Sequence, residues 1–187
     1  MLDGTATGPA TTLTLRKPTA ADGAAIWDLV RGCKPLDENS IYCNLVQCDH
    51  FAETCVVAED AERGVVGWIS GHMVPGEPGT LFVWQVAVSP AARGMGLGRK
   101  MLTHLVAREA LAVARIKTTI TKDNGASWAL FRGFAERRGA TLSDVPHFHA
   151  EDHFGGRHAT EHMVTITLEA EAETRRLSGP AETARAA

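Results

Sequence analysis

The sequence predicts an α/β protein with a mixed central sheet flanked by helices. Three observations support this prediction. Short apolar runs of strand length alternate with segments whose apolar residues recur at helical spacing. Glycine, proline and polar clusters separate many of these segments. The chain has 187 residues, of which 44% are apolar and 22% charged, which suits one globular domain with a substantial core.

The first half of the chain is expected to contain one helix, four strands and an irregular segment. A polar turn at Glu59–Arg63 divides two of the strands, as in a hairpin. The helix pattern places Ile26, Leu29 and Val30 on one face. In order, the expected elements are a strand at Thr12–Arg16, a helix at Thr19–Arg31, an irregular segment at Lys34–Phe51, and strands at Thr54–Ala58, Gly64–Val74 and Thr80–Val88.

The second half is expected to contain two helices and two clear strands. The first helix has apolar residues near helical spacing, and Gly139 is suited to end the second. In order, the expected elements are a helix from Leu97 to about Ala114, a strand at Ile116–Thr121, a helix at Asn124–Arg138, a long His-rich loop or weak strand at Thr141–Ala159, and a strand at His162–Leu168.

The two ends of the chain differ from this pattern. Residues 1–11 are rich in Gly, Thr and Ala and are expected to be disordered. Residues 169–187 alternate Ala, Glu, Thr and Arg, which predicts a tail that is partly helical or disordered. Residues 12–168 are expected to form a single domain.

Charge and hydropathy exclude several functions. The formal charge is −3 and the chain has no basic run, so we expect no nucleic-acid partner. No stretch approaches the roughly 18 apolar residues of a membrane helix, so we expect no membrane partner. The N-terminus does not look like a signal peptide. A cytoplasmic protein with four free thiols is the simplest interpretation.

A glycine-rich loop separates a strand from a helix, where backbone N–H groups can bind phosphate. Gly94, Gly96 and Gly98 alternate there, although alone they fit an ordinary tight turn. The dinucleotide pattern G-x-G-x-x-G fails, because Arg99 stands at its third glycine. The nucleoside-triphosphate loop also fails, because Met101 follows the lysine where Ser or Thr is needed.

The loop Arg93–Gly98 does match R-x-x-G-x-G, and with the preceding Val86–Pro90 it resembles the acetyl-CoA signature of the GNAT superfamily of N-acetyltransferases. A second motif agrees, because Asn124 and Phe131 stand at the ends of a segment similar to the superfamily's N-x-x-A-x-x-L-Y. The likeness covers roughly Leu13–Leu168.

The resemblance implies a mostly antiparallel mixed sheet that splays at its central strands to admit acetyl-CoA as co-substrate. It also implies that the backbone N–H near Val86 stabilises the oxyanion of the reaction. The cofactor-binding residues it implies are Val86, Val88, Arg93, Gly94, Met95, Gly96, Leu97, Gly98, Arg99, Asn124 and Phe131.

Two positions depart from the superfamily pattern. Many relatives carry a glutamate on the strand before the loop, where this chain offers only Trp84 and Gln85. Many have tyrosine, as acid for the leaving thiolate, where this chain has Phe131. The only tyrosine, Tyr42, takes part at the active site, orients substrate or is an ordinary surface residue. The candidates for the general base are Asp37, Glu38, His158 and Glu161.

The segment Pro35–Leu45 resembles the diaminobutyrate acetyltransferases of ectoine synthesis, as do Phe82–Val86, Asp123–Phe134 and His153–Met163. The resemblance implies transfer of acetyl to the 4-amino group of L-2,4-diaminobutyrate, giving N4-acetyl-L-2,4-diaminobutyrate. This reaction belongs to the synthesis of a compatible solute under osmotic stress.

The implied substrate carries two ammonium groups and one carboxylate, so its site needs carboxylates and hydrogen-bond donors. Asp37 and Glu161 are expected to bind the ammonium groups. The candidate substrate-binding residues are Asp37, Asn39, Tyr42, Trp84, His158 and Glu161, and the candidate catalytic residues are Glu161, Asp37, Val86 and Tyr42.

Other functions stay open at this point. The protein could acetylate another small amine or a protein N-terminus, or it could bind acyl-CoA without catalysis. A metal site is not expected, because neither the His-rich segment His147–His162 nor the cluster Cys43–Cys55 has the spacing of a known zinc motif. Members of the superfamily are often dimers, so a homodimer is possible.

Overall fold

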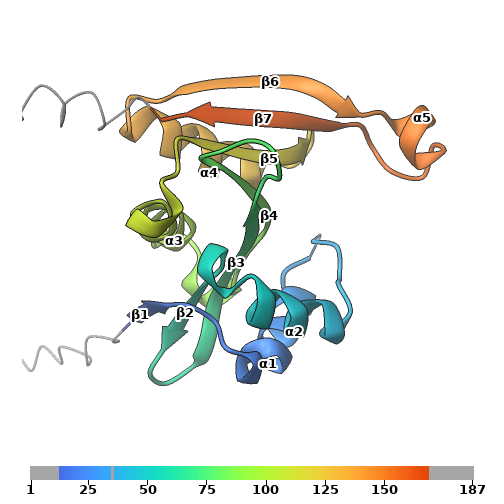
Figure 1. Ribbon diagram of the computed structural model, residues 1–187. Coiled ribbons are helices and arrows are strands. Elements are labelled where there is room, and N and C mark those ends of the chain that lie inside the picture. Colours follow the sequence, from blue (N-terminus) through green and yellow to red (C-terminus); the bar gives the residue numbers. More distant parts are fainter. Residues whose placement is uncertain (1–12, 35, 169–187) are drawn as a thin grey trace, which may run out of the picture.

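The computed structural model describes residues 13–34 and 36–168 (Figure 1). The predictions for the two tails, residues 1–11 and 169–187, lie outside the described residues. Within the described part, the strands form one seven-stranded sheet in the order β1-β2-β3-β4-β5-β7-β6. The strands are β1 (Leu13–Arg16), β2 (Val56–Asp60), β3 (Gly64–Met73), β4 (Thr80–Val88), β5 (Arg115–Thr121), β6 (Thr141–Phe148) and β7 (Glu161–Thr167).

The sheet is mixed and mostly antiparallel, as the superfamily resemblance implied. The one parallel pair among the described strands is β4 with β5, in the middle of the sheet. That pairing covers only Thr80–Phe82 against Arg115–Lys117. Beyond it the two strands diverge (Figure 1), so the predicted splay of the central strands is confirmed.

Two groups of helices cover the two faces of the sheet (Figure 1). On one face, α1 and α2 enclose a small core that includes Ile26, Val30 and Trp68. On the other, α3 and α4 enclose the main core, which includes Leu102 and Phe134. The helices are α1 (Gly23–Arg31), α2 (Ile41–His50), α3 (Leu97–Val106), α4 (Gly125–Arg137) and α5 (Ala150–Phe154), with 3-10 turns η1 (Ala20–Asp22), η2 (Ala52–Thr54), η3 (Pro90–Ala92) and η4 (Glu109–Leu111).

The prediction of an irregular segment at Lys34–Phe51 was wrong for Ile41–His50, which form α2, whereas residues 36–40 have neither helix nor strand. Ser40 caps the helix, and its hydroxyl accepts a hydrogen bond from the Cys43 N–H at 3.1 Å. The residues that α2 buries are Asn44, Gln47 and Cys48. Two of the three are polar, so a search for apolar periodicity could not find this helix.

The predicted helix from Leu97 to about Ala114 was too long, because α3 ends at Val106. Arg108 follows, and its Nη1 donates to the carbonyls of Glu53 and Cys55 at 2.7 and 2.8 Å. These bonds fix the chain beside β2, and Ala112 then adopts a left-handed conformation with φ of 44°. Alanine favours a helix in isolation, but the tertiary contacts prevail here.

The stretch Thr141–Ala159, predicted as a loop or weak strand, contains both β6 and α5. The strand alternative is therefore confirmed for its first part, whereas α5 was not predicted. Strands β6 and β7 form a long hairpin with α5 at its far end (Figure 1). The side chains of β6 are almost all exposed, which explains its weak apolar pattern.

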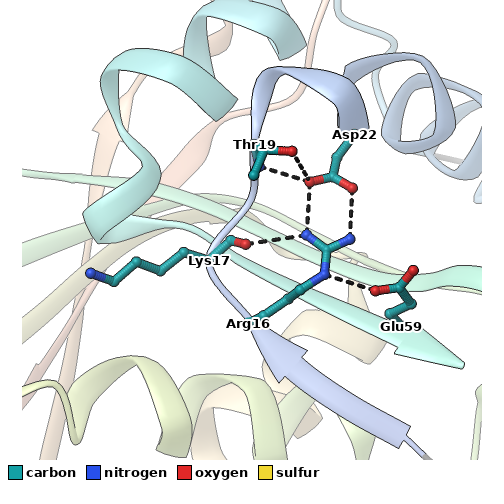
Figure 2. Close-up of polar contacts among 5 residues, drawn as sticks. All are labelled: Arg16, Lys17, Thr19, Asp22 and Glu59. Carbon is teal, nitrogen blue, oxygen red and sulfur yellow. Dashed lines mark hydrogen bonds and ion pairs between the residues drawn. The ribbon is translucent and has the colours of Figure 1, made fainter.

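An ionic cluster joins the first strand to the first helical turn and to β2 (Figure 2). The guanidinium of Arg16 makes two hydrogen bonds to the Asp22 carboxylate, at 2.7 and 2.8 Å, and a third to Glu59 at 2.8 Å. The N–H and hydroxyl of Thr19 also donate to Asp22. Hydrogen bonds from Arg16, followed by those from Thr19, lower the pKa of Asp22 to about 2 despite its burial.

Replacing Asp22 by Asn removes the charge that Arg16 pairs with. Because the pKa of Asp22 lies below its ordinary value of 3.8, its stabilisation is complete above about pH 4 and is lost as the pH falls towards 2. At pH 7 we expect Asp22→Asn to lower the free energy of unfolding by about 1–3 kcal/mol, measured by urea denaturation. The difference from wild type should shrink below pH 4.

Asp28→Asn is the matched control. The Asp28 side chain is 72% exposed and reaches Arg31 only at 4.0 Å, so its loss should leave stability nearly unaltered. Equal losses in both variants would contradict a specific contribution from the Arg16 cluster.

Candidate active site

A cavity of about 650 Å³ opens where β4 diverges from β5, between the glycine loop and α4. Most of the predicted cofactor residues line it. Those residues are Val86, Val88, Arg93, Gly94, Gly96, Leu97, Gly98, Arg99 and Asn124.

Two predicted cofactor residues lie elsewhere. Met95 is at the tip of the loop with 60% of its surface exposed, outside the cavity wall. Phe131 is 2% exposed and packs in the main core, so its ring supports α4 rather than lining the cavity. The motif Asn124–Phe131 therefore contributes to the hydrophobic core as well as to the cavity wall.

The glycine loop presents free backbone donors to the cavity. Gly94 and Gly96 have φ of +77° and +67°, a left-handed conformation that other residues adopt only with strain. The first bond within α3 runs from the Lys100 N–H to the Gly96 carbonyl at 3.0 Å. The N–H groups of Leu97, Gly98 and Arg99 consequently have no acceptor within the helix, and unpaired donors at a helix N-terminus favour an anion.

The open edge of β4 also faces the gap. The Ser89 N–H bonds to the Val66 carbonyl of β3 at 2.9 Å, and backbone direction alternates along an antiparallel strand. Val86 and Val88 therefore direct their N–H and C=O groups away from β3, towards the side where β5 has departed. These are the two residues whose main chains the superfamily resemblance assigned to the cofactor.

Several lining residues were missing from the predicted site. Cys33 lies at the end of α1, and its thiol donates to the Val88 carbonyl at 3.3 Å. Nothing in its local sequence indicates this position, which depends on how α1 packs against the sheet. Ser127 and Leu130 line the cavity from α4, and they belong to the second motif that the sequence already showed. Ala126, Ala129 and Gly133 complete that side of the helix.

Three predicted substrate residues, Asp37, His158 and Glu161, gather at the start of β7. Glu161 begins the strand, and its Oε1 lies 3.9 Å from Nε2 of His158. The carboxylate of Asp37, from the connection between α1 and α2, is close enough to influence the titration of Glu161, as is Asp123 from the end of β5. Residues distant in sequence thus form one acidic group.

The environment of Glu161 raises its pKa. Burial is the main cause, and the carboxylates of Asp37 and Asp123 add to it. His158 and a hydrogen bond with Thr119 act in the opposite direction. Oε2 of Glu161 is buried and has no hydrogen-bond partner among the residues that the structure describes. An unpaired buried carboxylate oxygen is costly, so this atom favours a ligand that donates a hydrogen bond, and a cationic donor suits it best.

Gln85 links the Asp37 segment to the sheet, a role that the sequence did not reveal. Its Nε2 donates to the backbone carbonyl of Asp37 at 2.9 Å, and its side chain is buried. On the same segment, the Asn39 carbonyl accepts a hydrogen bond from Trp27 at 3.1 Å. The Gln85 bond holds the connection between α1 and α2 against β4, and the Trp27 bond ties the same connection to α1.

The aromatic candidates are more exposed. Trp84 is the extra residue of a β-bulge, because Ser70 pairs with Gln85 and the next residue of β3 pairs with Val83. The bulge leaves Trp84 54% exposed beside Gln85. Tyr42 lies in the first turn of α2 and is 72% exposed. Neither has a hydrogen bond from its side chain to another described residue.

Metal ligands do not gather in the part of the chain that the structure describes. No group of three or more His, Cys, Asp or Glu side chains there is arranged to hold a metal ion. The cysteines are free thiols, and burial raises the pKa of Cys48 to about 12 and that of Cys55 to about 11. Within the same residues, no helix is long and apolar enough to cross a membrane.

Comparison with known proteins agrees with this geometry. Residues 24–134 match the Acetyltransferase (GNAT) family. The chain belongs to this family, and it is an acetyl-CoA-dependent N-acetyltransferase.

Within the family, the chain is similar to several L-2,4-diaminobutyric acid acetyltransferases. The chain is 46% identical to the L-2,4-diaminobutyric acid acetyltransferase of Methylotuvimicrobium alcaliphilum, over 82% of this chain and 90% of that protein. It is 44% identical to the enzyme of the same name from Vibrio cholerae, over 86% and 93%. The diaminobutyrate acetyltransferase of Paenibacillus lautus, solved with L-2,4-diaminobutyric acid and coenzyme A, superposes with a TM-score of 0.79 at 39% identity, covering 84% of this chain and 96% of that one.

Gly94→Ala tests the loop, because an added Cβ there meets no atom within 4 Å and only the backbone conformation is strained. A non-glycine residue in this conformation costs about 1–2 kcal/mol, so the loop should relax away from its anion-binding shape. We expect the KM for acetyl-CoA to rise about tenfold, with a matching loss of CoA affinity in calorimetry.

Gly64→Ala supplies the control. Gly64 has a φ of +72° and equally open surroundings, but it lies at the start of β3 rather than in the loop. The Gly64→Ala variant should lose about as much stability as Gly94→Ala but keep the wild-type affinity for CoA. A similar rise in KM in both variants would mean that general destabilisation, not the loop, controls binding.

Proposed function

We propose that the protein transfers the acetyl group of acetyl-CoA to the 4-amino group of L-2,4-diaminobutyrate, a step of ectoine synthesis. The observation that carries the proposal is the acidic group at the start of β7, where Oε2 of Glu161 is buried without a partner in the described chain. The similarity to diaminobutyrate acetyltransferases at 42–46% identity supports the same substrate.

The residues that line the cavity between β4 and β5 fit acetyl-CoA, which supplies the reactive thioester. The free N–H groups of Leu97, Gly98 and Arg99 would bind the pyrophosphate, with positive charge from Arg93 and Arg99 nearby. The open edge of β4 would pair with the pantetheine arm. The Val86 N–H would donate to the thioester carbonyl oxygen and stabilise the negative charge that develops there.

The charges of the site suit an amino acid with two ammonium groups. Glu161 and Asp37 would bind these groups, and Asp123 adds to the negative potential. The substrate carboxylate needs donors, which His158, Asn39, Tyr42 and Trp84 could supply. A simple diamine has no carboxylate and would make none of these contacts, so the site favours the amino acid.

Glu161 is the best candidate for general base. An alkylammonium has a pKa of about 10.4 and must lose a proton before it attacks. The raised pKa of Glu161 makes its carboxylate a stronger base than an exposed one. No acid is required on the leaving group, since a thiol pKa near 8.5 makes the thiolate a tolerable leaving group, so Phe131 in place of tyrosine is compatible with turnover.

The same proposal places the reaction in the cytoplasm, as part of the response to osmotic stress, and includes a homodimer. The support for a dimer is β6, which lies at one edge of the sheet and exposes Val145 and Phe148 by 58% and 40%. An exposed edge strand with apolar side chains is suited to pair with another chain. Light scattering of the purified protein measures its mass directly.

Substrate choice is tested by thiol release from acetyl-CoA with a panel of amines. We expect kcat/KM for L-2,4-diaminobutyrate to exceed that for putrescine by about 100-fold or more, because putrescine lacks the carboxylate. Proton NMR of the product should show acetylation at the 4-amino group. Equal rates with putrescine or a peptide N-terminus would favour the alternative acceptors, and CoA binding without thiol release would favour a non-catalytic domain.

Glu161→Gln removes the proposed base and ammonium partner. We expect kcat/KM for diaminobutyrate to fall about 10- to 100-fold, with the KM for acetyl-CoA unchanged. In the wild type, protonation of Glu161 should reduce activity at a higher pH than protonation of an ordinary carboxylate would, and this acid limb should vanish in the variant. Glu151→Gln, the same change at an exposed site on α5, is the control and should behave as wild type. Normal turnover of Glu161→Gln would refute the role.

A further inference from the structure

A second cavity, of about 550 Å³, lies between α4 and the hairpin of β6 and β7. Its wall carries the cations Lys122 and Arg132, the indole of Trp128, and the side chains of Asp144 and His162. None of these groups has a place in the acetyl transfer described above.

The cavity is distinct from the one that suits CoA. The two lie against different arcs of α4, which meet at Ala129. Gly125, Trp128 and Arg132 face the second cavity, whereas Ser127, Leu130 and Gly133 face the first. Seen along a helix of 3.6 residues per turn, these two sets point in different directions. A ligand in one cavity therefore need not displace a ligand from the other.

Arg132 is held in place without using its hydrogen-bonding capacity. Its guanidinium stacks over the Trp128 ring at 4.6 Å, and Trp128 is itself fixed by a 3.0 Å hydrogen bond to the Thr121 carbonyl. Neither Arg132 nor Lys122 makes an ion pair with any residue in the described ranges. The planar fork of an arginine positioned in this way suits two parallel hydrogen bonds to a carboxylate or phosphate.

The one carboxylate in the wall is already paired. Asp144 on β6 lies 3.1 Å from Nδ1 of His162 on β7, and His162 is 5% exposed. With one negative and two permanently positive side chains, the wall carries a net charge of at least one positive unit. His162 follows Glu161 directly but points to the opposite face of β7, because successive side chains of a strand alternate.

We infer that this cavity is a binding site for a small oxyanion, either an organic carboxylate or a phosphate monoester, separate from the acetyl-transfer site. The anion binds to Arg132 and Lys122 beside the Asp144–His162 pair. It lies behind the strand that carries Glu161, on the face away from the substrate.

The test uses the full-length protein saturated with CoA, so that the glycine loop cannot bind the probe. Sodium phosphate and sodium acetate are titrated separately by calorimetry, against sodium chloride at matched ionic strength. We expect saturable binding of one equivalent of at least one probe, and the probe that binds identifies the phosphate or carboxylate class. Arg132→Gln should weaken this binding about tenfold or more, because a charge-assisted bidentate contact is lost.

Arg137→Gln is the matched control. It removes the same charge from the exposed last turn of α4, outside the cavity wall. It should bind the probe like the wild type, and thermal unfolding of both variants confirms that they are folded. Absence of saturable binding to the CoA complex, or equal weakening in Arg132→Gln and Arg137→Gln, would overturn the proposal. Binding that occurs only without CoA would show that the probe occupies the glycine loop instead.

Discussion

The site depends on one constraint, the loss of pairing between β4 and β5 after three residues. A sheet normally satisfies its backbone groups internally, and an unpaired edge in its middle is costly unless another partner binds there. Residues from both faces of the sheet line the gap between the two strands, with Cys33 just after α1 on one side and Leu130 of α4 on the other. The bulge at Trp84 lies on the diverging part of β4. The open edge is therefore built into the fold, and the extended arm of CoA has the shape to cover it.

Much of this fold could be predicted from local patterns, because most elements bury apolar residues at a regular period. The failures have two physical causes. Helix α2 buries Asn44 and Gln47, and β6 buries almost nothing, so neither has the apolar period of its structure. Helix α3 ends early because Arg108 bonds to carbonyls near β2, a contact between residues more than 50 positions apart. Such contacts cannot be seen in a short window of sequence.

The cofactor side and the proposed acceptor side of the site also differ in how far local sequence predicts them. The glycine loop is contiguous, since its function needs left-handed residues and free N–H groups directly before a helix, and the sequence therefore predicts it. The proposed acceptor side combines the α1–α2 connection, the bulge of β4 and the start of β7. Family resemblance pointed to Asp37 and Glu161, but no local pattern indicated Gln85, which anchors the Asp37 backbone at 2.9 Å. Phe131 is the opposite of Gln85, because a motif indicated it as a site residue and the structure places it in the hydrophobic core.

In the proposed reaction, the titration of Glu161 links substrate binding to proton transfer. Its pKa is raised by burial and by neighbouring carboxylates, so the ionised form is disfavoured while the acidic group lacks a cation. An ammonium group beside it would lower that pKa and favour the carboxylate that a base must offer. When the ammonium gives up its proton before the attack, the stabilising charge is lost and the affinity of Glu161 for the proton rises again. The same burial that makes the empty site unfavourable therefore favours both cation binding and proton removal. This coupling requires the partly desolvated position at the start of β7, which an exposed carboxylate on α5 does not have.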